Sequence, residues 1–462
     1  MTLTGPGRSR RNGVLRSHLF VPLAALALGL APAPALAVAS TMELSAAIKS
    51  AGGPKDVRGF YTARSHLPLW IRDGRIGAEA DTLLHLIETA ELDGLKGKDY
   101  RPRAIAEAIE KARDGTPRSL AKAEVLLSRS FAAYARDMRR PRDVGTIYAD
   151  AQLAPRTPSM RDVLREAAAA PSISDYVERV GWMNPIYGQL RTAAMAKLGA
   201  AADDDPTAAE ERRIVRLNLD RAAALPVDTG QRYVVVDAAA ARLTMYEKGT
   251  VAGTMRVVVG KPSEQTPMMA ALIRYASVNP YWNVPPDLVR SRVAPGAIES
   301  GAKYLKAKRF EVLSDWSEQA RVIPAKDVDW QAIRDGRIEP RVRQLPGPGN
   351  AMGQIKFMFP NQLGVYLHDT PDKGLLRESD RMFSAGCVRL EDAPRLARWL
   401  FGKPVTVKSK KPEQRVDLPQ PVPVYLTYLT AAAAKDGIAM REDVYGRDAL
   451  PDKSDRRRLA SR

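Results

Sequence analysis

The spacing of apolar residues changes once along the chain, and this change limits the folds that it can adopt. In alanine-rich stretches such as 78–95 and 120–138, apolar residues recur three and four positions apart, as on one face of a helix. From 232 to 260 apolar and polar residues alternate instead, the pattern of half-buried strands, with a turn signal at Lys248-Gly249. The sequence therefore predicts an α+β protein in which an α-helical lobe precedes a β-rich domain.

Smaller changes in composition divide the chain further. Residues 198–213 are polar, acidic and alanine-rich, which predicts a linker leading into a short helix. Residues 287–345 are charged and partly helical, as expected of an insertion that hangs over one face of a sheet. The predicted divisions are an export signal over 1–37, a helical lobe over 41–199, a linker over 200–228, a β-rich domain over 229–410 that contains the insertion, a further segment over 411–450 and a disordered tail over 451–462.

The first 37 residues have the pattern of a cleaved export signal. Arginines at 8, 10, 11 and 16 precede an apolar run that ends at Ala35-Leu36-Ala37, a small-x-small cleavage site. The alternative, an uncleaved membrane anchor, needs about 20 apolar residues, and prolines at 22, 32 and 34 interrupt this run. The adjacent arginines lack the apolar residue that normally follows in a twin-arginine signal. We therefore expect export and cleavage after Ala37.

The chain is strongly basic, with a formal net charge of +18. Removal of the signal takes away four arginines and no acidic residue, which leaves 18 − 4 = +14. Such a charge favours a polyanionic neighbour such as nucleic acid, a membrane surface or an anionic wall polymer. Export argues against nucleic acid, as does the lack of a basic motif interleaved with aromatic residues. Charge scattered over the surface, without a specific polyanion site, is the other interpretation.

Cys387 is the only cysteine of the chain, and it follows His368 by 19 residues. A single cysteine cannot form an internal disulfide, so in an exported chain its thiol is either buried and inert or kept for its reactivity. The stretch 364–369 predicts a strand that ends at His368, and 383–390 predicts a loop that returns to the sheet. This spacing allows sulfur and imidazole to meet.

A thiol titrates near pH 8.5, and a nearby imidazole or cation increases its thiolate fraction. His368 is the candidate for that group, while Arg389 is placed to stabilise the thiolate or to hold an anionic substrate group. Gly386 allows a backbone N–H to approach a developing oxyanion. An inert cysteine near an unrelated histidine remains the alternative.

A compact helix is predicted directly after this loop, over 391–404. Asp392 is its expected N-cap, Gly402 stands at the C′ position and Pro404 ends it. Leu396 and Leu400 are expected to face inward.

Other catalytic classes fit the sequence less well. Histidines at 66, 85 and 368 are too scattered for a zinc site. Ser300 to Lys303 match the S-x-x-K motif of serine-type penicillin-binding proteins, but no K-T-G or K-S-G follows. A sortase has its histidine much further before a T-L-x-T-C motif, and papain-like enzymes place cysteine before histidine.

The stretches YLHDT (366–370) and FSAGCVRLED (383–392) resemble the signature of the L,D-transpeptidases, a histidine on a strand followed by S-x-G-C-x-R around the nucleophile. VVVGKPSEQTPMMA, VNPYWNVPPDL and GPGNAMGQIKFMFPN are also similar to this family, especially to its large Gram-negative branch with an N-terminal scaffold lobe and a capping insertion. FYTARSHLPLW resembles the start of that scaffold, and VPVYLTYLT and EDVYGRD resemble its C-terminal extension. The residues that match the central signature are His368, Ser384, Gly386, Cys387 and Arg389.

The resemblance implies a periplasmic peptidoglycan enzyme with a YkuD-type catalytic domain over 229–410 and no cofactor or metal. His368 would help to deprotonate Cys387, whose thiolate attacks the carbonyl before D-Ala at position four of a stem tetrapeptide. D-Ala would leave, and an amine of a second stem would resolve the thioester into a 3→3 crosslink. Ser384, Gly386 and Arg389 would serve the oxyanion and the substrate.

Two aromatic residues, Tyr366 and Trp282, are candidates to line the cleft, with ordinary core packing as the alternative for each. Carbapenems are expected to acylate Cys387. The acceptor amine and the oligomeric state stay open, and the alternative function is a non-catalytic scaffold that binds the cell wall and retains the fold.

The chain departs from the family pattern at two places. Many members have a second histidine directly before the Gly-Cys pair, where this chain has Ala385. Many large members also have a peptidoglycan-binding helical module, and no such pattern occurs in 171–228. Substrate targeting would then depend on the cleft, the insertion and the basic surface.

Overall fold

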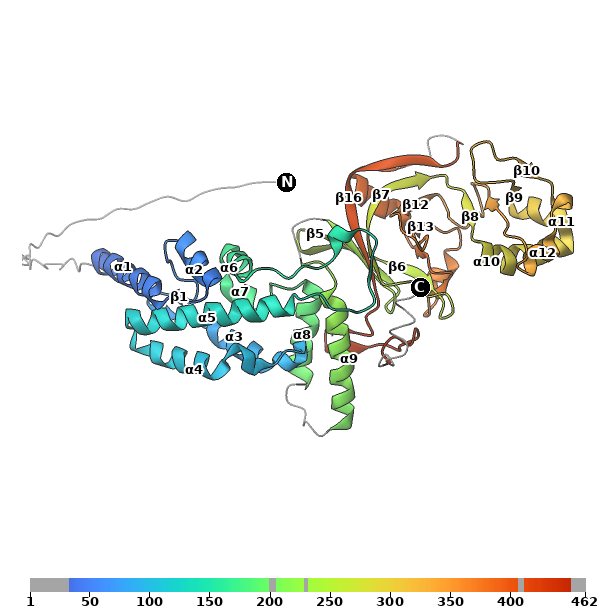
Figure 1. Cartoon of the computed structure of the whole chain (residues 1–462). Coiled ribbons are helices and arrows are strands. Elements are labelled where there is room, and N and C mark those ends of the chain that lie inside the picture. Colours follow the sequence, from blue (N-terminus) through green and yellow to red (C-terminus); the bar gives the residue numbers. More distant parts are fainter. Residues whose placement is uncertain (1–32, 199–204, 228–231, 406–410, 450–462) are drawn as a thin grey trace, which may run out of the picture. The chain divides into compact units, whose positions relative to one another are not determined.

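The computed structural model describes residues 33–198, 205–227, 232–405 and 411–449, with side chains from residue 41. Most of the predicted export signal and all of the predicted tail lie outside these residues. Residues 44–462 form one compact unit, and Figure 1 shows its described parts. Within the described ranges, no helix is both long enough and apolar enough to cross a membrane.

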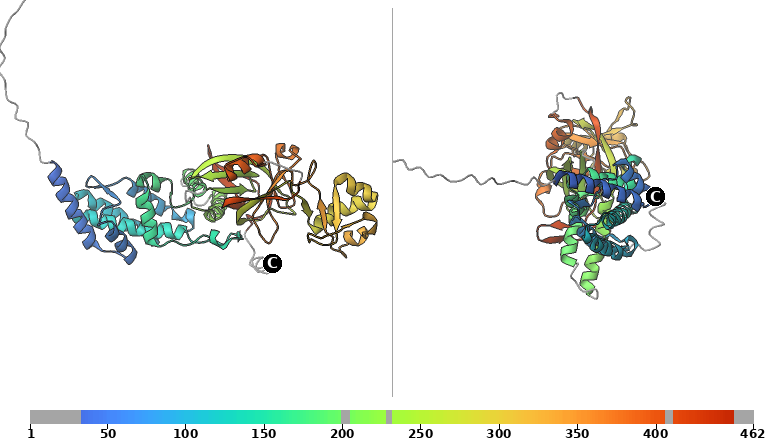
Figure 2. Two further views of the ribbon diagram at one scale, coloured as in Figure 1. Left: turned by 90° about the horizontal axis from the view of Figure 1, so that it is seen from above. Right: turned by 90° about the vertical axis from the view of Figure 1, so that its left-hand side faces the viewer.

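The predicted helical lobe is present, and its helices pack together in all three views (Figures 1 and 2, blue to green). Helix α5 carries much of its core, and Thr116 caps α5 by accepting a hydrogen bond from the Ser119 N–H. Leu127 and Phe131 of α5 are fully buried in the same apolar cluster as side chains of the surrounding helices. The helices are α1 (Ala33–Ala51), α2 (Lys55–Ala63), α3 (Glu79–Glu88), α4 (Pro102–Lys111), α5 (Pro117–Met138), α6 (Met160–Ala169), α7 (Ile173–Glu178), α8 (Pro185–Leu198) and α9 (Pro206–Ala223).

Helix α9 occupies most of the stretch for which the sequence predicts a linker over 200–228. It has 18 residues rather than the short helix expected, and Asp205 caps it through the Thr207 N–H. Val215 and Leu219 lie four positions apart and are fully buried in the core of the helical lobe. The acidic, alanine-rich composition at the start of this stretch hides the apolar face that follows it.

The β-rich domain is also present, and its strands close into a ring. Within the described residues, the strand order is β12-β13-β15-β6-β5-β4-β16-β7, and β12 pairs with β7 as well as with β13. A closed sheet leaves no unpaired edge between these strands. Their bounds are β4 (Tyr233–Asp237), β5 (Arg242–Glu247), β6 (Thr250–Gly260), β7 (Met269–Val278), β12 (Ile355–Met358), β13 (Leu367–His368), β15 (Val388–Leu390) and β16 (Gln414–Thr427), with β3 (Ile147–Tyr148) and β14 (Met382–Ser384) paired to β7 and β6.

Two local predictions in this domain are confirmed. Lys248 and Gly249 both have positive φ, 50° and 76°, and join β5 to β6. Helix α13 (Ala393–Phe401) is capped by Asp392, which accepts from the Arg395 N–H, and ends at Gly402 with a φ of 69°. Leu396 and Leu400 of this helix are buried in the core of the ring.

The stretch of the predicted insertion forms a small unit with its own core. A sheet in the order β10-β9-β11-β8 packs with short helices around Val289, Val293 and Val342, all essentially inaccessible to solvent. The elements are β8 (Trp282–Val284), α10 (Pro286–Leu288), a π-helical turn (Val289–Val293), α11 (Ala294–Lys308), β9 (Phe310–Leu313), β10 (Val322–Ile323), α12 (Trp330–Arg334) and β11 (Val342–Gln344). We call residues 282–344 the cap.

The chain beyond residue 410 returns to the ring and then leaves it. Strand β16 pairs with both β4 and β7, so the sheet continues past the predicted boundary at 410. It is followed by a hairpin of β17 (Ala431–Ala434) and β18 (Gly437–Met440).

A buried ion pair in the helical lobe makes a stability prediction. Arg191 Nε lies 2.9 Å from Asp93 Oδ1, and both side chains are at most 1% exposed. Tyr187 and Tyr134 donate to the two carboxylate oxygens at 2.8 and 2.6 Å. Because Asp93→Ala leaves the arginine buried without its anion, we expect the free energy of unfolding to fall by about 3–5 kcal/mol. Urea denaturation measures this loss.

The matched control is Glu107→Ala, which removes an exposed carboxylate 3.8 Å from Lys111. Its urea midpoint should stay close to that of the wild type, since exposed pairs contribute little. Equal midpoints for both variants would contradict a structural role for the buried pair.

Candidate active site

Strand register places the sulfur and the imidazole on the same face of the ring. Strands β13 and β15 are parallel, with Leu367 opposite Val388 and His368 opposite Arg389. Leu367 and Val388 are fully buried in the core. Because neighbouring side chains of a strand point to opposite faces, His368, Arg389 and the residue before Val388, which is Cys387, share the other face.

The same face carries a row of polar side chains across two more strands. Lys356 of β12 lies opposite His368, and Ser277 of β7 lies opposite Lys356. Glu413 joins the two: its Oε1 lies 2.9 Å from Lys356 Nζ, and its Oε2 accepts from Ser277 Oγ at 2.8 Å. Glu413 also accepts from the Tyr281 N–H at 2.7 Å. Glu413 therefore compensates the positive charge of Lys356. The row of polar side chains continues from Lys356 to His368 and Arg389.

Tyr366 is the residue whose N–H and hydroxyl favour the thiolate form of Cys387. Burial raises the pKa of the Cys387 thiol, while the backbone N–H of Tyr366, the Arg389 guanidinium and the Tyr366 hydroxyl each act to lower it. Burial and the neighbouring Cys387 raise the pKa of Tyr366, so its phenol keeps its proton and remains a donor. At rest the thiol is protonated, and its Sγ lies 3.8 Å from the Gly364 carbonyl oxygen.

His368 is a neutral base in this environment. Burial, followed by the positive charges of Arg389 and Lys356, lowers its pKa to about 3. Nδ1 lies 2.6 Å from the carbonyl oxygen of Asp369, so Nδ1 carries the proton and donates to it. Nε2 is then left with its lone pair, as an acceptor. Among the described residues His368 forms no hydrogen bond with Cys387, so their catalytic pairing stays a prediction.

The turn before the cysteine is fixed by Ser384. Its Oγ donates to the Cys387 carbonyl oxygen at 2.5 Å and accepts from the Gly386 N–H at 3.2 Å. Gly386 has a φ of 99°, which favours glycine at this position. The N–H of Gly386 is thus occupied by Ser384 Oγ, and the approach of a backbone N–H to an oxyanion at this turn stays a prediction. The N–H of Cys387 donates to no described residue and is the better candidate for an oxyanion.

Arg389 is the open cation of the site. Its guanidinium forms neither an ion pair nor a hydrogen bond within the described part of the chain. Burial and the charge of Arg292, from the π-helical turn of the cap, lower its pKa. The charge of Asp372 acts in the opposite direction, and Arg292 has its own anion, since its Nη2 lies 3.7 Å from Glu264 Oε2. Within the described residues, Arg389 therefore has a free guanidinium that can bind a carboxylate.

Trp282 belongs to the cap rather than to the surroundings of the sulfur. It is half-buried and packs against the cap core, with its ring 6.2 Å from that of Phe310. Ala385, the residue at the position of the second histidine in other members, also packs against the cap core. The cleft role of Trp282 stays a prediction, whereas Tyr366 and Cys387 act on each other's pKa.

Sequence reasoning missed three polar residues that support the site: Lys356, Glu413 and Thr266. The sequence does point to Lys356, because it is a charged residue between apolar residues of a strand. Alternation of side chains places it on the face opposite to the core. Glu413 has a φ of 51° and follows the predicted end of the domain, so no local pattern points to it. In the described ranges no three His, Cys, Asp or Glu side chains form a group that could hold a metal ion.

The lowered pKa of His368 predicts a pH-dependent stability. The folded chain keeps the imidazole neutral down to about pH 3, whereas the unfolded chain takes up a proton below about pH 6.5. The stability is complete above pH 6.5 and falls as the pH drops towards 3. Between pH 7.5 and 5, the free energy of unfolding of His368→Gln should therefore fall by about 2 kcal/mol less than that of the wild type. Urea denaturation at each pH measures this difference.

His85→Gln is the matched control for this titration, since His85 is exposed. We expect it to follow the wild type at each pH. A His368→Gln variant that also follows the wild type would show that the imidazole is not buried as a neutral group.

The contact of Tyr366 with the sulfur predicts a change in thiol reactivity. Tyr366→Phe removes one of the two donors to the thiolate, so the apparent thiol pKa should rise by about one unit. The rate of alkylation by iodoacetamide as a function of pH measures this shift. Tyr275→Phe, on β7, is the control and should leave the profile unchanged; an unchanged profile in Tyr366→Phe would contradict the contact.

Comparison with known proteins identifies both parts of the chain. The Scaffold domain model matches residues 55–193, and the model of the YkuD L,D-transpeptidase catalytic domain matches residues 231–409. A Haemophilus influenzae protein provisionally named an L,D-transpeptidase is 25% identical over 397 residues, which cover 84% of this chain and 77% of that protein.

Two solved structures are more distant. The L,D-transpeptidase from Mycobacterium smegmatis and the Ldtfm–avibactam carbamoyl enzyme are each 15% identical to this chain, with TM-scores of 0.21 and 0.20. The matches cover 42% and 44% of this chain and 58% and 51% of those structures. TM-scores of this size support no further comparison. The two family matches establish that the chain consists of a scaffold domain followed by an L,D-transpeptidase catalytic domain of the YkuD family.

Proposed function

We propose that the chain is a peptidoglycan L,D-transpeptidase that forms 3→3 crosslinks between stem peptides through a thioester on Cys387. The environment of the sulfur supports this most directly. The groups of Tyr366 and the charge of Arg389 favour its thiolate form, and the neutral His368 shares its face of the ring. The catalytic domain supports the reaction class, and these observations support the role proposed for each residue.

In the first step, Cys387 attacks the carbonyl carbon that precedes D-Ala in the donor tetrapeptide. The thiol is neutral at rest and His368 has a low pKa, so no ion pair forms before the substrate binds. The thiol proton passes to Nε2 of His368 as the S–C bond forms. The Cys387 N–H is directed to the oxyanion, for which one donor is worth roughly 2.7–4 kcal/mol. Arg389 holds a carboxylate of the stem.

In the second step, the C–N bond breaks and D-Ala leaves with the proton from the imidazolium. An amine of a second stem then attacks the thioester and loses its proton to His368, and the sulfur departs as thiol. Another amine or water would resolve the same thioester. The product therefore reports the acceptor.

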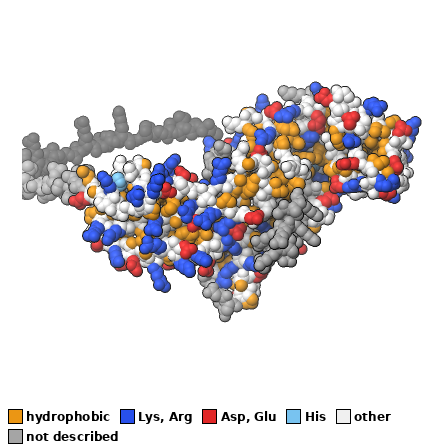
Figure 3. Space-filling model, in the orientation of Figure 1, with side chains coloured by type: hydrophobic (Ala, Val, Ile, Leu, Met, Phe, Trp, Pro, Cys, Tyr) orange, Lys and Arg blue, Asp and Glu red, His pale blue; other side chains and the backbone are white. Residues whose placement is uncertain are grey.

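The substrate lies outside the cytoplasmic membrane, so we propose that the predicted signal over 1–37 exports the chain to the periplasm. The positive charge is compatible with an anionic wall polymer. On the face drawn in Figure 3, Lys and Arg side chains interleave with Asp and Glu instead of forming one continuous patch. This face therefore gives no support to binding by a single basic patch.

Digestion of purified muropeptides tests the proposal. The mature protein should convert tetrapeptide monomers into a 3→3 linked dimer with release of D-Ala, detected by mass spectrometry. Cys387→Ala should form neither product, because no other thiol exists in the chain. Intact-mass spectrometry should show a carbapenem adduct on the wild type and none on this variant.

A variant of His368 tests the proposed general base. His368→Gln should lower kcat by roughly 10²–10⁴-fold, the usual contribution of a general base. Unchanged tetrapeptides with a folded wild type would contradict the transpeptidase. Binding of muropeptides without turnover would then favour the non-catalytic scaffold.

A further inference from the structure

The turn that carries Cys387 is held by a loop distant in sequence. Thr266 Oγ1 donates to the Gly386 carbonyl oxygen and accepts from the Gly260 N–H, both at 2.9 Å. The N–H of Lys261 donates to the Ser384 carbonyl oxygen at 3.0 Å. Thr266 is fully buried. We call residues 260–266 the support loop, because it binds the turn at both Ser384 and Gly386.

The support loop is in turn held by the end of the chain. The Tyr445 hydroxyl donates to the Gly260 carbonyl oxygen at 2.5 Å, and the backbone carbonyl oxygen of Tyr445 accepts from Gln265 Nε2 at 2.9 Å. Arg447 donates from Nε and Nη2 to Gln265 Oε1 at 3.0 and 2.8 Å. Its Nη2 also reaches the Thr266 carbonyl oxygen at 2.9 Å. Tyr445 and Arg447, two residues of the segment 443–448, thus bind the support loop at several points.

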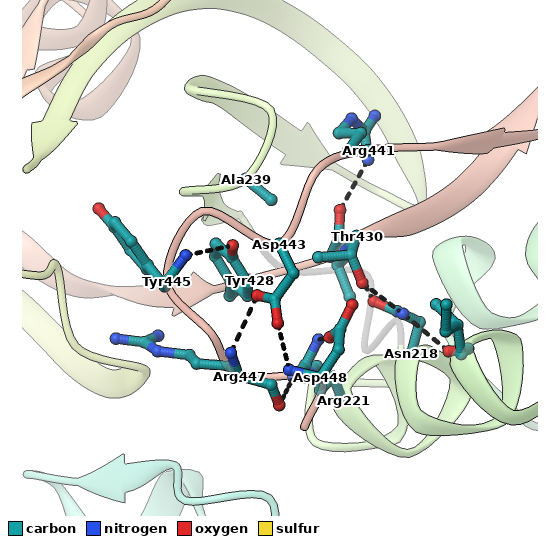
Figure 4. Close-up of polar contacts among 12 residues, drawn as sticks. Asn218, Arg221, Ala239, Tyr428, Thr430, Arg441, Asp443, Tyr445, Arg447 and Asp448 are labelled. Carbon is teal, nitrogen blue, oxygen red and sulfur yellow. Dashed lines mark hydrogen bonds and ion pairs between the residues drawn. The ribbon is translucent and has the colours of Figure 1, made fainter. Parts of the chain in front are cut away.

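Residues 443–448, which we call the clamp, are stiffened by stacking and by a local cap. The rings of Tyr428 and Tyr445 stack with centroids 4.8 Å apart, and the Arg447 guanidinium lies 5.2 and 4.9 Å from them. The Asp443 carboxylate accepts from the N–H groups of Arg447 and Asp448 at 2.9 and 2.6 Å. Figure 4 shows these groups around one turn of the chain.

Helix α9 anchors the clamp. Arg221 of α9 forms a buried ion pair with Asp448 at 2.7 Å and donates to the Arg447 carbonyl oxygen at 2.6 Å. Asn218 exchanges two hydrogen bonds of 2.8 Å with Thr430 (Figure 4). α9 is packed into the core of the helical lobe. A continuous set of hydrogen bonds therefore runs from α9 through the clamp and the support loop to Gly386.

We propose that the clamp and the support loop position Cys387 for reaction, with Gln265, Thr266, Tyr445 and Arg447 as positioning residues. Among the described residues, none of the four forms a hydrogen bond or ion pair with Cys387, His368 or Arg389, so they act through the turn. A displaced turn would move the sulfur away from the donors of Tyr366 and from the substrate carbonyl. The turnover part of this proposal depends on the proposed function, whereas its effect on the thiol does not.

Two substitutions in the support loop test the proposal. Thr266→Val removes the hydroxyl that joins Gly386 to Gly260, and Thr266→Ser restores it. Gln265→Met removes the partner of both clamp residues at a half-buried position. Arg441→Met is the matched control, because Arg441 lies on the same C-terminal segment but binds the Leu429 carbonyl oxygen at 2.7 Å, away from the support loop.

The measurements are kcat and KM on tetrapeptides, the pH profile of iodoacetamide alkylation, and thermal unfolding. Thr266→Val and Gln265→Met should lower kcat roughly tenfold or more with KM unchanged, and should raise the apparent thiol pKa. Thr266→Ser and Arg441→Met should match the wild type. If Thr266→Val does not fold, Gln265→Met decides the question.

The proposal would be overturned if folded Thr266→Val and Gln265→Met had the kcat and the alkylation profile of the wild type. A change confined to KM, or an equal loss of kcat in Arg441→Met, would also overturn it. If the wild type processes no muropeptide, the proposed function fails. The alkylation profiles then still decide whether the clamp positions the thiol.

Discussion

The parallel pairing of β13 with β15 is the contact on which the site depends. It consists of two residue pairs, Leu367 with Val388 and His368 with Arg389. Burial of the first pair in the core fixes the orientation of both strands, and a slip of one residue would turn the imidazole into the core. The chemical face is therefore determined by apolar packing on the opposite face. Ser384 then fixes the last turn before the sulfur.

Charge along the polar row explains why the resting site is neutral. His368 lies between Lys356 and Arg389 in the register, and both cations oppose its protonation. Glu413 forms an ion pair with the lysine, whereas Asp372 acts on the arginine only through its charge, without an ion pair among the described residues. An anionic substrate is thus the group that would complete the charge balance. Its binding would also relieve the opposition to an imidazolium, so the base would become stronger when the donor is in place.

Local signals in the sequence account for most of what could be predicted. The turn at Lys248-Gly249 and the capped helix after the cysteine depend on residues within a few positions of one another, and both are confirmed. The contacts of Thr266 with Gly386 and of Glu413 with Ser277 join residues 120 and 136 positions apart. No period or motif encodes such pairings. The S-x-G-C-x-R motif around Cys387 indicated the nucleophile. Only the strand register brings Tyr366 to the same face as Cys387.

The lengths of the strands imply an uneven resistance to local opening. Strands β7 and β16 have 10 and 14 residues, whereas β13 has 2 and β15 has 3. The ring is thus closed by its shortest strand pairs beside the candidate active site. We call the pairing of β13 with β15 the seam, and few backbone hydrogen bonds must break for it to open. Segments of this kind open at a lower free energy than the rest of a domain. Amide protons of the seam would therefore exchange with solvent earlier than those of β7.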